Sequence, residues 1–324
     1  MKEFSIHSYS QMQVSLVNEK AKEDQRAFFR ECEENYQKQV ETAASLCQGE
    51  KQMILLAGPS ASGKTTTAHK IAKTIIAQGR KAEVVSLDDF YRNRAEIPLC
   101  EDGKPDLESV YALDLKVMEK CFRELLETGE AMIPQYDFHV SRRAEEWRKV
   151  YCSPGQILVV EGIHGLNPEV LKTLDTQKVI KMYVSARTKY MDGSENALIP
   201  KQLRLIRRMV RDYKFRNTAP QITISLWENV CSGERNYINP YRDGADYKID
   251  SAMDYEPGVY RSILQPFLEE SLKNERVNGR DFQGVEKLPE QDEILDRLMR
   301  DLARFAPLPE TLIPEDSVVR EFLG

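Results

Sequence analysis

Residues 58–65 read Gly-Pro-Ser-Ala-Ser-Gly-Lys-Thr and match the phosphate-loop pattern, in which four residues separate a glycine from Gly-Lys-Thr. Such a loop surrounds an anion with backbone N–H groups, and the dipole of the following helix adds to their attraction. Lys64 would then reach the outer phosphates, and Thr65 would offer its hydroxyl to Mg²⁺. The pattern predicts a triphosphate site formed by Gly58, Ser60, Ala61, Ser62, Gly63, Lys64, Thr65 and Thr66.

Two short apolar segments further along the chain end in acidic residues. Residues 82–87 precede Asp88 and Asp89, and residues 155–160 lead to Glu161. In open parallel sheets, ligands bind outside the carboxyl ends of the strands. An alcohol that accepts a phosphoryl group needs a base for its proton, and Asp88 is the favoured base. Either aspartate would also suit a helix N-cap, the role we favour for Asp89.

Glu161 suits a position beside magnesium in a phosphate-loop enzyme, and the alternative is an incidental acid in a turn. The most basic stretch of the chain is 200–216. Arg204, Arg208 and Arg211 would fall near one face of a helix there. Because guanidinium groups stabilise a phosphoryl group in transfer, this helix is predicted to be a lid. A solvated helix paired with acids elsewhere is the alternative.

Residues 133–138 read Ile-Pro-Gln-Tyr-Asp-Phe and are followed by Arg142, Arg143 and three further charged residues within 145–148. An aromatic substrate wall with a basic rim fits this composition. An ordinary hairpin with a charged, solvated face fits it equally well, so both interpretations stay open.

The elements that must position these residues follow from apolar periodicity. The run 53–57 is typical of a buried strand, and 66–78 places Ile71, Ile75 and Ile76 on one helical face. Residues 14–46 are charged with sparse apolar positions and predict one or two helices that form a packing arm or a dimer element. Further strands are expected at 82–87, 157–160, 179–185 and 247–251, and further helices at 112–126, 259–272 and 292–305. The predicted fold class is α/β.

The whole chain has 324 residues, 41% of them hydrophobic and 30% charged, and a net charge of -6. This acidic balance argues against nucleic-acid binding through a general basic surface. The six cysteines contain no CxxC pair, so reduced thiols in the cytoplasm are expected. Neither a signal-peptide core nor a bilayer-spanning apolar run is found, so no membrane partner is expected.

Taken together and in order, these motifs resemble those of uridine kinases, within the wider uridine kinase and phosphoribulokinase group. The resemblance covers roughly residues 50 to 260. Near the end of the chain, residues 319–322 are similar to the ending of a bacterial uridine kinase-like subgroup. It implies a P-loop NTPase fold, with a parallel sheet flanked by helices, a helical lid and a helical N-terminal extension. The motifs that carry it are residues 58–65, 86–91, 134–138, 161–168 and 207–212.

The resemblance also implies roles for the matching positions. Asp88 corresponds to the general base for a nucleoside 5′-hydroxyl, and Thr65, Asp88 and Glu161 are magnesium neighbours. Glu108 falls where the family holds the ribose hydroxyls with an aspartate. The implied substrate-binding residues are Tyr91, Glu108, Tyr136, Phe138 and Arg143, and the implied lid arginines are Arg208, Arg211 and Arg216, of which Arg216 belongs to the ATP site.

Two positions depart from the family pattern. A base-reading histidine is replaced by Ser141, with His139 two residues earlier, and a further lid arginine is Thr218. A site that lacks a hydrogen bond to its substrate loses discrimination more readily than catalysis. Pyrimidine specificity is therefore not implied by the resemblance.

The sequence predicts a cytoplasmic kinase that uses ATP and Mg²⁺, with a nucleoside as the favoured acceptor; a homo-oligomer is allowed. The expected divisions are an N-terminal helical extension (1–50), a kinase domain (51–275) and a C-terminal helical segment (276–324). Three alternatives stay open: a kinase for a sugar phosphate or another small alcohol, a nucleotide-controlled regulatory protein, and a degenerate kinase kept for binding.

Overall fold

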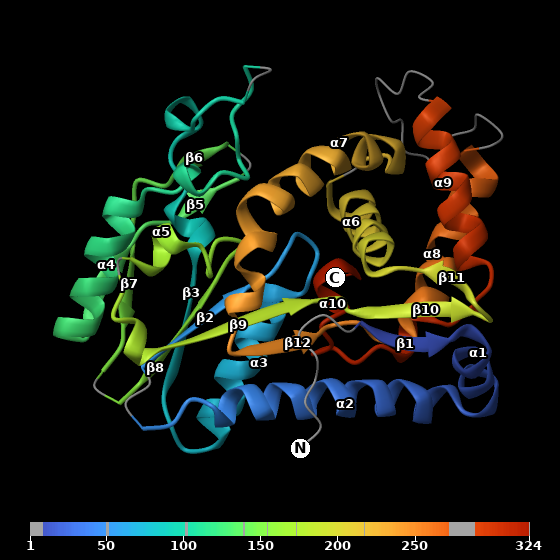
Figure 1. Ribbon diagram of the computed structural model, residues 1–324, viewed down its shortest axis with the longest axis horizontal. Coiled ribbons are helices and arrows are strands. Elements are labelled where there is room, and N and C mark those ends of the chain that lie inside the picture. The colour runs from blue at the N-terminus through green and yellow to red at the C-terminus, as the bar shows by residue number, and fades with distance from the viewer. Residues whose placement is uncertain are drawn as a thin grey trace.

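A five-stranded parallel sheet with the order β12-β9-β2-β8-β3 forms the centre of the molecule (Figure 1). The computed structural model describes residues 9–49, 52–100, 103–138, 140–153, 155–172, 174–216, 218–271 and 289–323. The strands are β2 (Met53–Ala57), β3 (Ala82–Ser86), β8 (Ile157–Glu161), β9 (Val179–Ser185) and β12 (Tyr247–Asp250). Every residue of β2 and β8 is buried, as expected for strands covered on both faces. The predicted α/β phosphate-loop fold is confirmed.

The two faces of the sheet support separate cores because successive side chains of a strand point to opposite sides. On β2, Ile54 and Leu56 join the core with α2 (Gln25–Ser45) and α3 (Lys64–Ala77). Met53 and Leu55 join a second core with α4 (Leu115–Thr128). The loops that follow β2, β3 and β8 leave the sheet at the carboxyl ends of these parallel strands. There Glu161 pairs in register with Leu56 on one side and Ser86 on the other.

The N-terminal segment forms two helices, α1 (Val14–Glu23) and α2, which agrees with the prediction of one or two helices at 14–46. The chain turns at Asp24, whose carboxylate caps α2 by accepting a hydrogen bond from the N–H of Ala27. Figure 1 shows α2 running along much of the molecule below the sheet. The Tyr36 hydroxyl lies 2.6 Å from that of Thr67 on α3, so α2 contacts the helix that follows the phosphate loop. The domain boundary at residue 50 stays a prediction, and the one at 275 lies outside the described residues.

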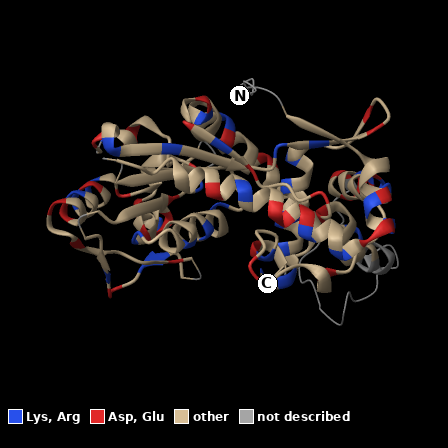
Figure 2. Ribbon diagram, turned by 90° about the horizontal axis from the view of Figure 1, so that it is seen from below, with Lys and Arg blue, Asp and Glu red and all other residues tan. Residues whose placement is uncertain are grey.

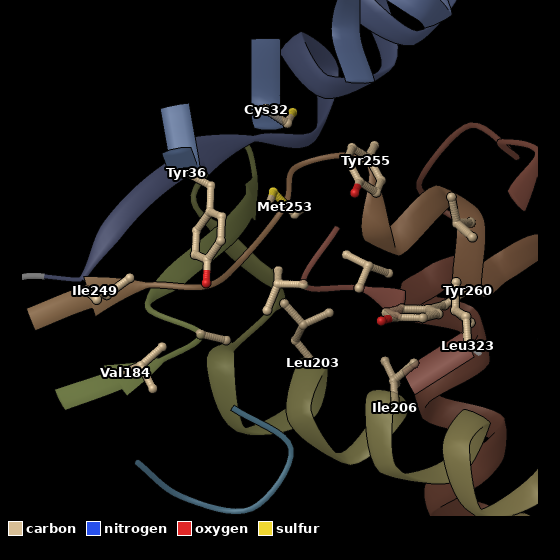
Figure 3. Close-up of a cluster of buried hydrophobic side chains, with 14 of the residues drawn as sticks. Cys32, Tyr36, Val184, Leu203, Ile206, Ile249, Met253, Tyr255, Tyr260 and Leu323 are labelled. Carbon is tan, nitrogen blue, oxygen red and sulfur yellow. The ribbon is translucent and has the colours of Figure 1, made fainter. Parts of the chain in front are cut away.

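A second region covers the opposite end of the molecule. It contains α6 (Pro200–Arg216), α7 (Pro220–Gly233), α8 (Glu256–Ser271) and α9 (Pro289–Leu302). A small sheet, β1 (Ser10–Gln13), β10 (Thr188–Asp192) and β11 (Glu195–Leu198), lies beside these helices. Figure 3 shows side chains of this core, with Leu323 beside Tyr260 and with Leu203 and Ile206 on the facing side of α6.

Short elements complete the region over the acidic strand ends. The aromatic segment 133–138 contributes to two small sheets: β4 (Glu130–Ile133) pairs with β7 (Arg148–Tyr151), and β5 (Tyr136–Asp137) pairs with β6 (Arg142–Arg143). The remaining helices are α5 (Pro168–Leu171) and α10 (Arg320–Leu323).

Basic and acidic residues are interspersed along the chain (Figure 2). In the part of the chain that the structure describes, no helix is long and apolar enough to cross a membrane.

Candidate active site

The phosphate loop joins β2 to α3 and has the tight backbone that its glycines permit. A Cβ atom on Gly58 would lie 2.1 Å from the carbonyl oxygen of Val184, so only glycine fits against β9. Ala61 (φ 55°) and Gly63 (φ 83°) adopt left-handed conformations. Alternating conformations of this kind turn successive N–H groups toward one point and create an anion-binding concavity. The predicted loop residues therefore form the expected cradle at the N-terminus of α3.

Lys64, Thr65 and Glu161 lie together at the open end of this cradle. The ammonium group of Lys64 donates a hydrogen bond to the Pro59 carbonyl at 3.1 Å, which places its charge over the loop. The Thr65 hydroxyl lies 3.4 Å from Glu161 Oε1, and the Ser86 hydroxyl donates to the same oxygen at 2.7 Å. Burial and the charge of Asp88 raise the pKa of Glu161, whereas Lys64 opposes the shift.

Asp88 lies on the 3₁₀ turn Leu87–Phe90 that follows β3. The side chain of Ser86 caps this turn by accepting from the N–H of Asp88, so the cap that we assigned to Asp89 belongs to Ser86. Burial raises the pKa of Asp88, the nearby Lys64 lowers it, and Asp89 raises it further. Asp88 thus lies within electrostatic reach of Lys64 and Glu161, and its carboxylate is not used in capping.

Asp89 faces a different space from Asp88. It lines a cavity of about 710 Å³ whose wall also includes Thr65, Glu161 and Arg148. Burial raises the pKa of Asp89 and the charge of Arg148 lowers it.

The oxygen atoms at the strand ends fit a hard divalent cation. Mg²⁺ commonly takes one or two carboxylates and completes its shell with water and substrate phosphates. Thr65, Asp88 and Glu161 supply a hydroxyl and two carboxylates beside the phosphate cradle. The described residues contain no cluster of three His, Cys, Asp or Glu that would hold a metal unaided. A cation here would therefore depend on phosphate oxygens.

Three of the predicted substrate residues form one aromatic cluster. The ring centroid of Tyr91 lies 5.5 Å from that of Tyr136 and 5.7 Å from that of Phe138, and the last two rings lie 4.8 Å apart. Phe138 remains 57% exposed, so one side of the cluster is open. The guanidinium of Arg143 donates to the carbonyl of Tyr91 at 3.1 Å and thereby ties the β5–β6 hairpin to the turn that carries Asp88. The hairpin is therefore present and carries an aromatic cluster, and the use of this cluster as a substrate wall stays a prediction.

Glu108 lies between this region and α7. A Cβ atom on Gly233 would lie 2.3 Å from the Cβ of Glu108, so the carboxylate packs directly against the end of α7. Burial raises the pKa of Glu108 to about 7, and the charge of Arg208 lowers it in part. Arg208 thus contributes to the electrostatic environment of both the phosphate loop and Glu108.

Only one of the three predicted lid arginines has a direct contact with the loop. Arg208 donates to the Ser60 hydroxyl at 3.0 Å. Arg211 and Arg216 instead pair with Asp212, each at 3.3 Å, and Arg216 is 57% exposed. Their acidic partner lies within α6 itself and the helix is largely buried, so these pairs differ from the alternative of a solvated helix paired with acids elsewhere.

Two further arginines of α6, Arg204 and Arg207, donate hydrogen bonds to backbone carbonyls of the loop. Arg204 donates to the Ser60 carbonyl at 3.0 Å and binds both oxygens of Glu234. Arg207 donates to the Ala61 carbonyl at 3.3 Å. Both belong to the basic stretch 200–216, but their acidic partners lie 30 and 49 residues away, respectively. No local pattern marks such a pair.

The C-terminal segment, for which no chemistry was predicted, lies against the loop. A Cβ atom on Gly63 would lie 2.4 Å from the side chain of Val318, and Glu321 accepts a hydrogen bond from the N–H of Thr66. The family-like ending 319–322 was the only sequence signal at this position.

The two departures from the family pattern lie at the margin of the site. Ser141 adopts a left-handed φ of 53°, and its carbonyl accepts from the N–H of Arg94. The Thr218 hydroxyl donates to the Arg216 carbonyl at 3.2 Å. His139 lies outside the described residues. Further inside, burial lowers the pKa of His164 to about 4, so this imidazole is neutral.

Comparison with known proteins agrees with the geometry. The model of the Phosphoribulokinase / Uridine kinase family matches residues 53–256. The uridine kinase of Lactobacillus helveticus (strain DPC 4571) is 30% identical over 223 residues, which span 66% of this chain and 97% of that protein. The uridine kinase of Bacillus pumilus (strain SAFR-032) is 29% identical over 220 residues, which span 66% and 95% of the two chains.

A solved structure, phosphoribulokinase from Rhodobacter spheroides, has a TM-score of 0.41 and 20% identity. It covers 61% of this chain and 68% of that chain. Such a likeness adds nothing to the family match, which rests on the sequence.

Proposed function

This chain belongs to the phosphoribulokinase / uridine kinase family, and on that premise we propose that it transfers the γ-phosphoryl group of ATP to the 5′-hydroxyl of a nucleoside. The observation that supports this most strongly is the grouping of Asp88 with Lys64 and Glu161 outside the strand ends. A phosphate cradle alone binds a nucleotide, whereas a carboxylate beside it also provides for an alcohol acceptor.

Asp88 receives the proton of the attacking hydroxyl in this proposal. Its raised pKa makes the carboxylate a stronger base than a solvated aspartate, and the charge of Lys64 opposes the shift. Proton transfer to a positioned base contributes about 10²- to 10⁴-fold in rate. The remaining acceleration comes from the alignment of donor and acceptor.

The negative charge that develops on the transferred phosphoryl group would be stabilised by several positively charged side chains. Lys64 lies over the loop, and Arg208 donates a hydrogen bond to the hydroxyl of Ser60 in the loop. Arg211 and Arg216 complete the lid set, with Asp212 holding both guanidinium groups at the end of α6. Magnesium would be held by Thr65, Asp88 and Glu161, and when bound it supplies further positive charge to the phosphate oxygens.

The acceptor would lie between the aromatic cluster and Glu108. Tyr136 and Phe138 offer ring faces and edges to a planar base, with Tyr91 and Arg143 supporting them. Glu108 offers carboxylate oxygens to the ribose hydroxyls, which its ionised form binds more strongly than its protonated form. The reduced thiols expected from the cysteine pattern and the use of ATP support a cytoplasmic location.

A panel of acceptors tests the proposal. Purified protein is incubated with ATP, Mg²⁺ and each of uridine, cytidine, adenosine, guanosine and a set of sugar phosphates. We expect a nucleoside 5′-monophosphate as the product, and ADP formation that depends on the nucleoside. Phosphorylation of a sugar phosphate alone would replace the nucleoside assignment, and slow ATP hydrolysis unaffected by any acceptor would refute the kinase mechanism.

A further inference from the structure

The first turn of α3 contains the N–H groups that a phosphate loop offers to its nucleotide. The N–H groups at the start of a helix have no partner within the helix. Here the N–H of Thr67 already donates to the Gly63 carbonyl at 3.0 Å. The N–H groups of Lys64, Thr65 and Thr66 therefore point toward the phosphate site, where a phosphate loop binds the α- and β-phosphates.

One of these three donors is taken by the chain itself. The Oε2 atom of Glu321 accepts a hydrogen bond from the N–H of Thr66 at 3.0 Å. A carboxylate resembles a phosphate in charge and in its acceptor oxygens, so the same N–H cannot serve both at full strength. Its charge would also repel a phosphate placed nearby.

The surrounding contacts keep Glu321 in this position. Val318 and Phe322 are fully buried, and the guanidinium of Arg207 lies over the Phe322 ring at 4.8 Å from its centroid. Val318 lies so close to Gly63 that any Cβ there would overlap its side chain. In Figure 1 the C-terminal helix α10 lies beside α6, next to the start of α3.

We propose that Glu321 is an intramolecular competitor for the nucleotide phosphates, seated on the Thr66 N–H by the segment 317–323. The inference rests on the proposed ATP site. ATP binds only when its phosphate displaces this carboxylate, so the segment sets the nucleotide affinity of the protein. A change that draws the segment away from Gly63 raises that affinity.

The Glu321→Gln variant separates charge from shape. Its amide oxygen still accepts a hydrogen bond from Thr66, so the packing of the segment is retained while the negative charge is removed. We expect the variant to bind ATP about tenfold more tightly by calorimetry, in the absence of any acceptor. Adenosine, which lacks phosphates, should bind both proteins equally. The matched control is Glu315→Gln, which changes an exposed acid just before this segment and should leave ATP affinity unchanged.

Each outcome decides the inference. Equal or weaker ATP binding by E321Q, or equal tightening for ATP and adenosine, would overturn it. ATP binding by neither protein would overturn it as well, because removing the charge would then open no site. A failure to phosphorylate nucleosides leaves these binding results intact, so the two proposals fail separately.

Hydrogen exchange in the unmodified protein provides a test that needs no variant. Saturating ATP is expected to increase amide exchange in a peptide covering 317–323, because the contact with Thr66 is broken. Unchanged exchange in the ATP-bound protein would contradict displacement of the segment.

Discussion

Arg207 and Glu256 form an ion pair in which neither side chain has exposed surface, with an Nη2–Oε1 distance of 2.6 Å. The same guanidinium donates to the carbonyls of Ala61 and Ser251. The phosphate loop is thus attached to the loop after β12 through one buried cation. Breaking a buried pair by removing one partner leaves an uncompensated charge.

Arg207→Met should therefore destabilise the protein by about 3–5 kcal/mol, since Glu256 would be left buried and unpaired. Urea unfolding measures this change. The matched control is Arg235→Met, which removes an exposed pair with Glu228 and should change the stability far less. Equal effects from the two variants would contradict the role given to Arg207.

Asp88→Asn should bind ATP with near-normal affinity but lose about 10²- to 10⁴-fold in kcat, because the amide cannot accept the proton of the acceptor. Asp192→Asn is the control and should have a much smaller effect, because Asp192 lies on β10 with its side chain half exposed and paired with Arg304. Steady-state kinetics with a nucleoside and ATP distinguish them. Full activity of D88N would remove Asp88 from the mechanism.

Arg208→Ala and Lys64→Ala should each lower kcat, since both remove positive charge beside the phosphates. We expect at least a tenfold loss for Arg208, the lid arginine that contacts the loop at Ser60. Arg235→Ala, on an exposed face after α7, should leave the rate unchanged. An unaltered kcat in R208A would rule out its part in the lid.

The pH dependence of acceptor use should report Glu108. Burial places its pKa at about 7, so the carboxylate loses its proton as the pH rises through 7. Because the ionised form accepts hydrogen bonds from ribose hydroxyls more strongly than the protonated form, kcat/KM for the nucleoside should rise with pH and level off above 7. In the Glu108→Gln variant this rise of kcat/KM with pH should disappear. If the rise remains, the titrating group is not Glu108.

The same pKa shift has a consequence for stability. A carboxylate with a raised pKa is harder to ionise in the folded protein than in the unfolded chain, so it costs folding free energy as the pH rises from about 4.5 to 7. Glu108→Gln should therefore be more stable than the parent protein at pH 8 and bind the acceptor less well. Thermal unfolding at pH 5 and pH 8 measures the difference.

The sequence predicted the central sheet well because buried parallel strands are continuous apolar runs. The strands at 53–57 and 179–185 agree with β2 and β9 residue for residue. The small sheet was missed, because β1 has only four residues and pairs in parallel with β10 far along the chain. Helix α4 begins at Leu115, three residues later than predicted, because Asp114 caps it.

The site was predictable where chemistry is local in sequence. The phosphate loop, Asp88 and Glu161 each follow a strand, and their grouping follows from the parallel sheet. The supporting contacts depend on residues distant in sequence, such as Arg204 with Glu234 and Thr66 with Glu321. Arg211 and Arg216 share Asp212, which lies within the same basic stretch and was not weighed as their partner.

The contact between Thr66 and Glu321 also affects folding during synthesis, because it joins residues 255 positions apart. The sheet that shapes the phosphate loop is complete once β12 has been made, and at roughly 5–20 residues per second Glu321 follows about 4 to 14 seconds later. During that interval the start of α3 is open to any phosphate compound in the cell. A nascent chain can therefore bind nucleotide before its own carboxylate arrives, and the order of these two events sets which anion the site first holds.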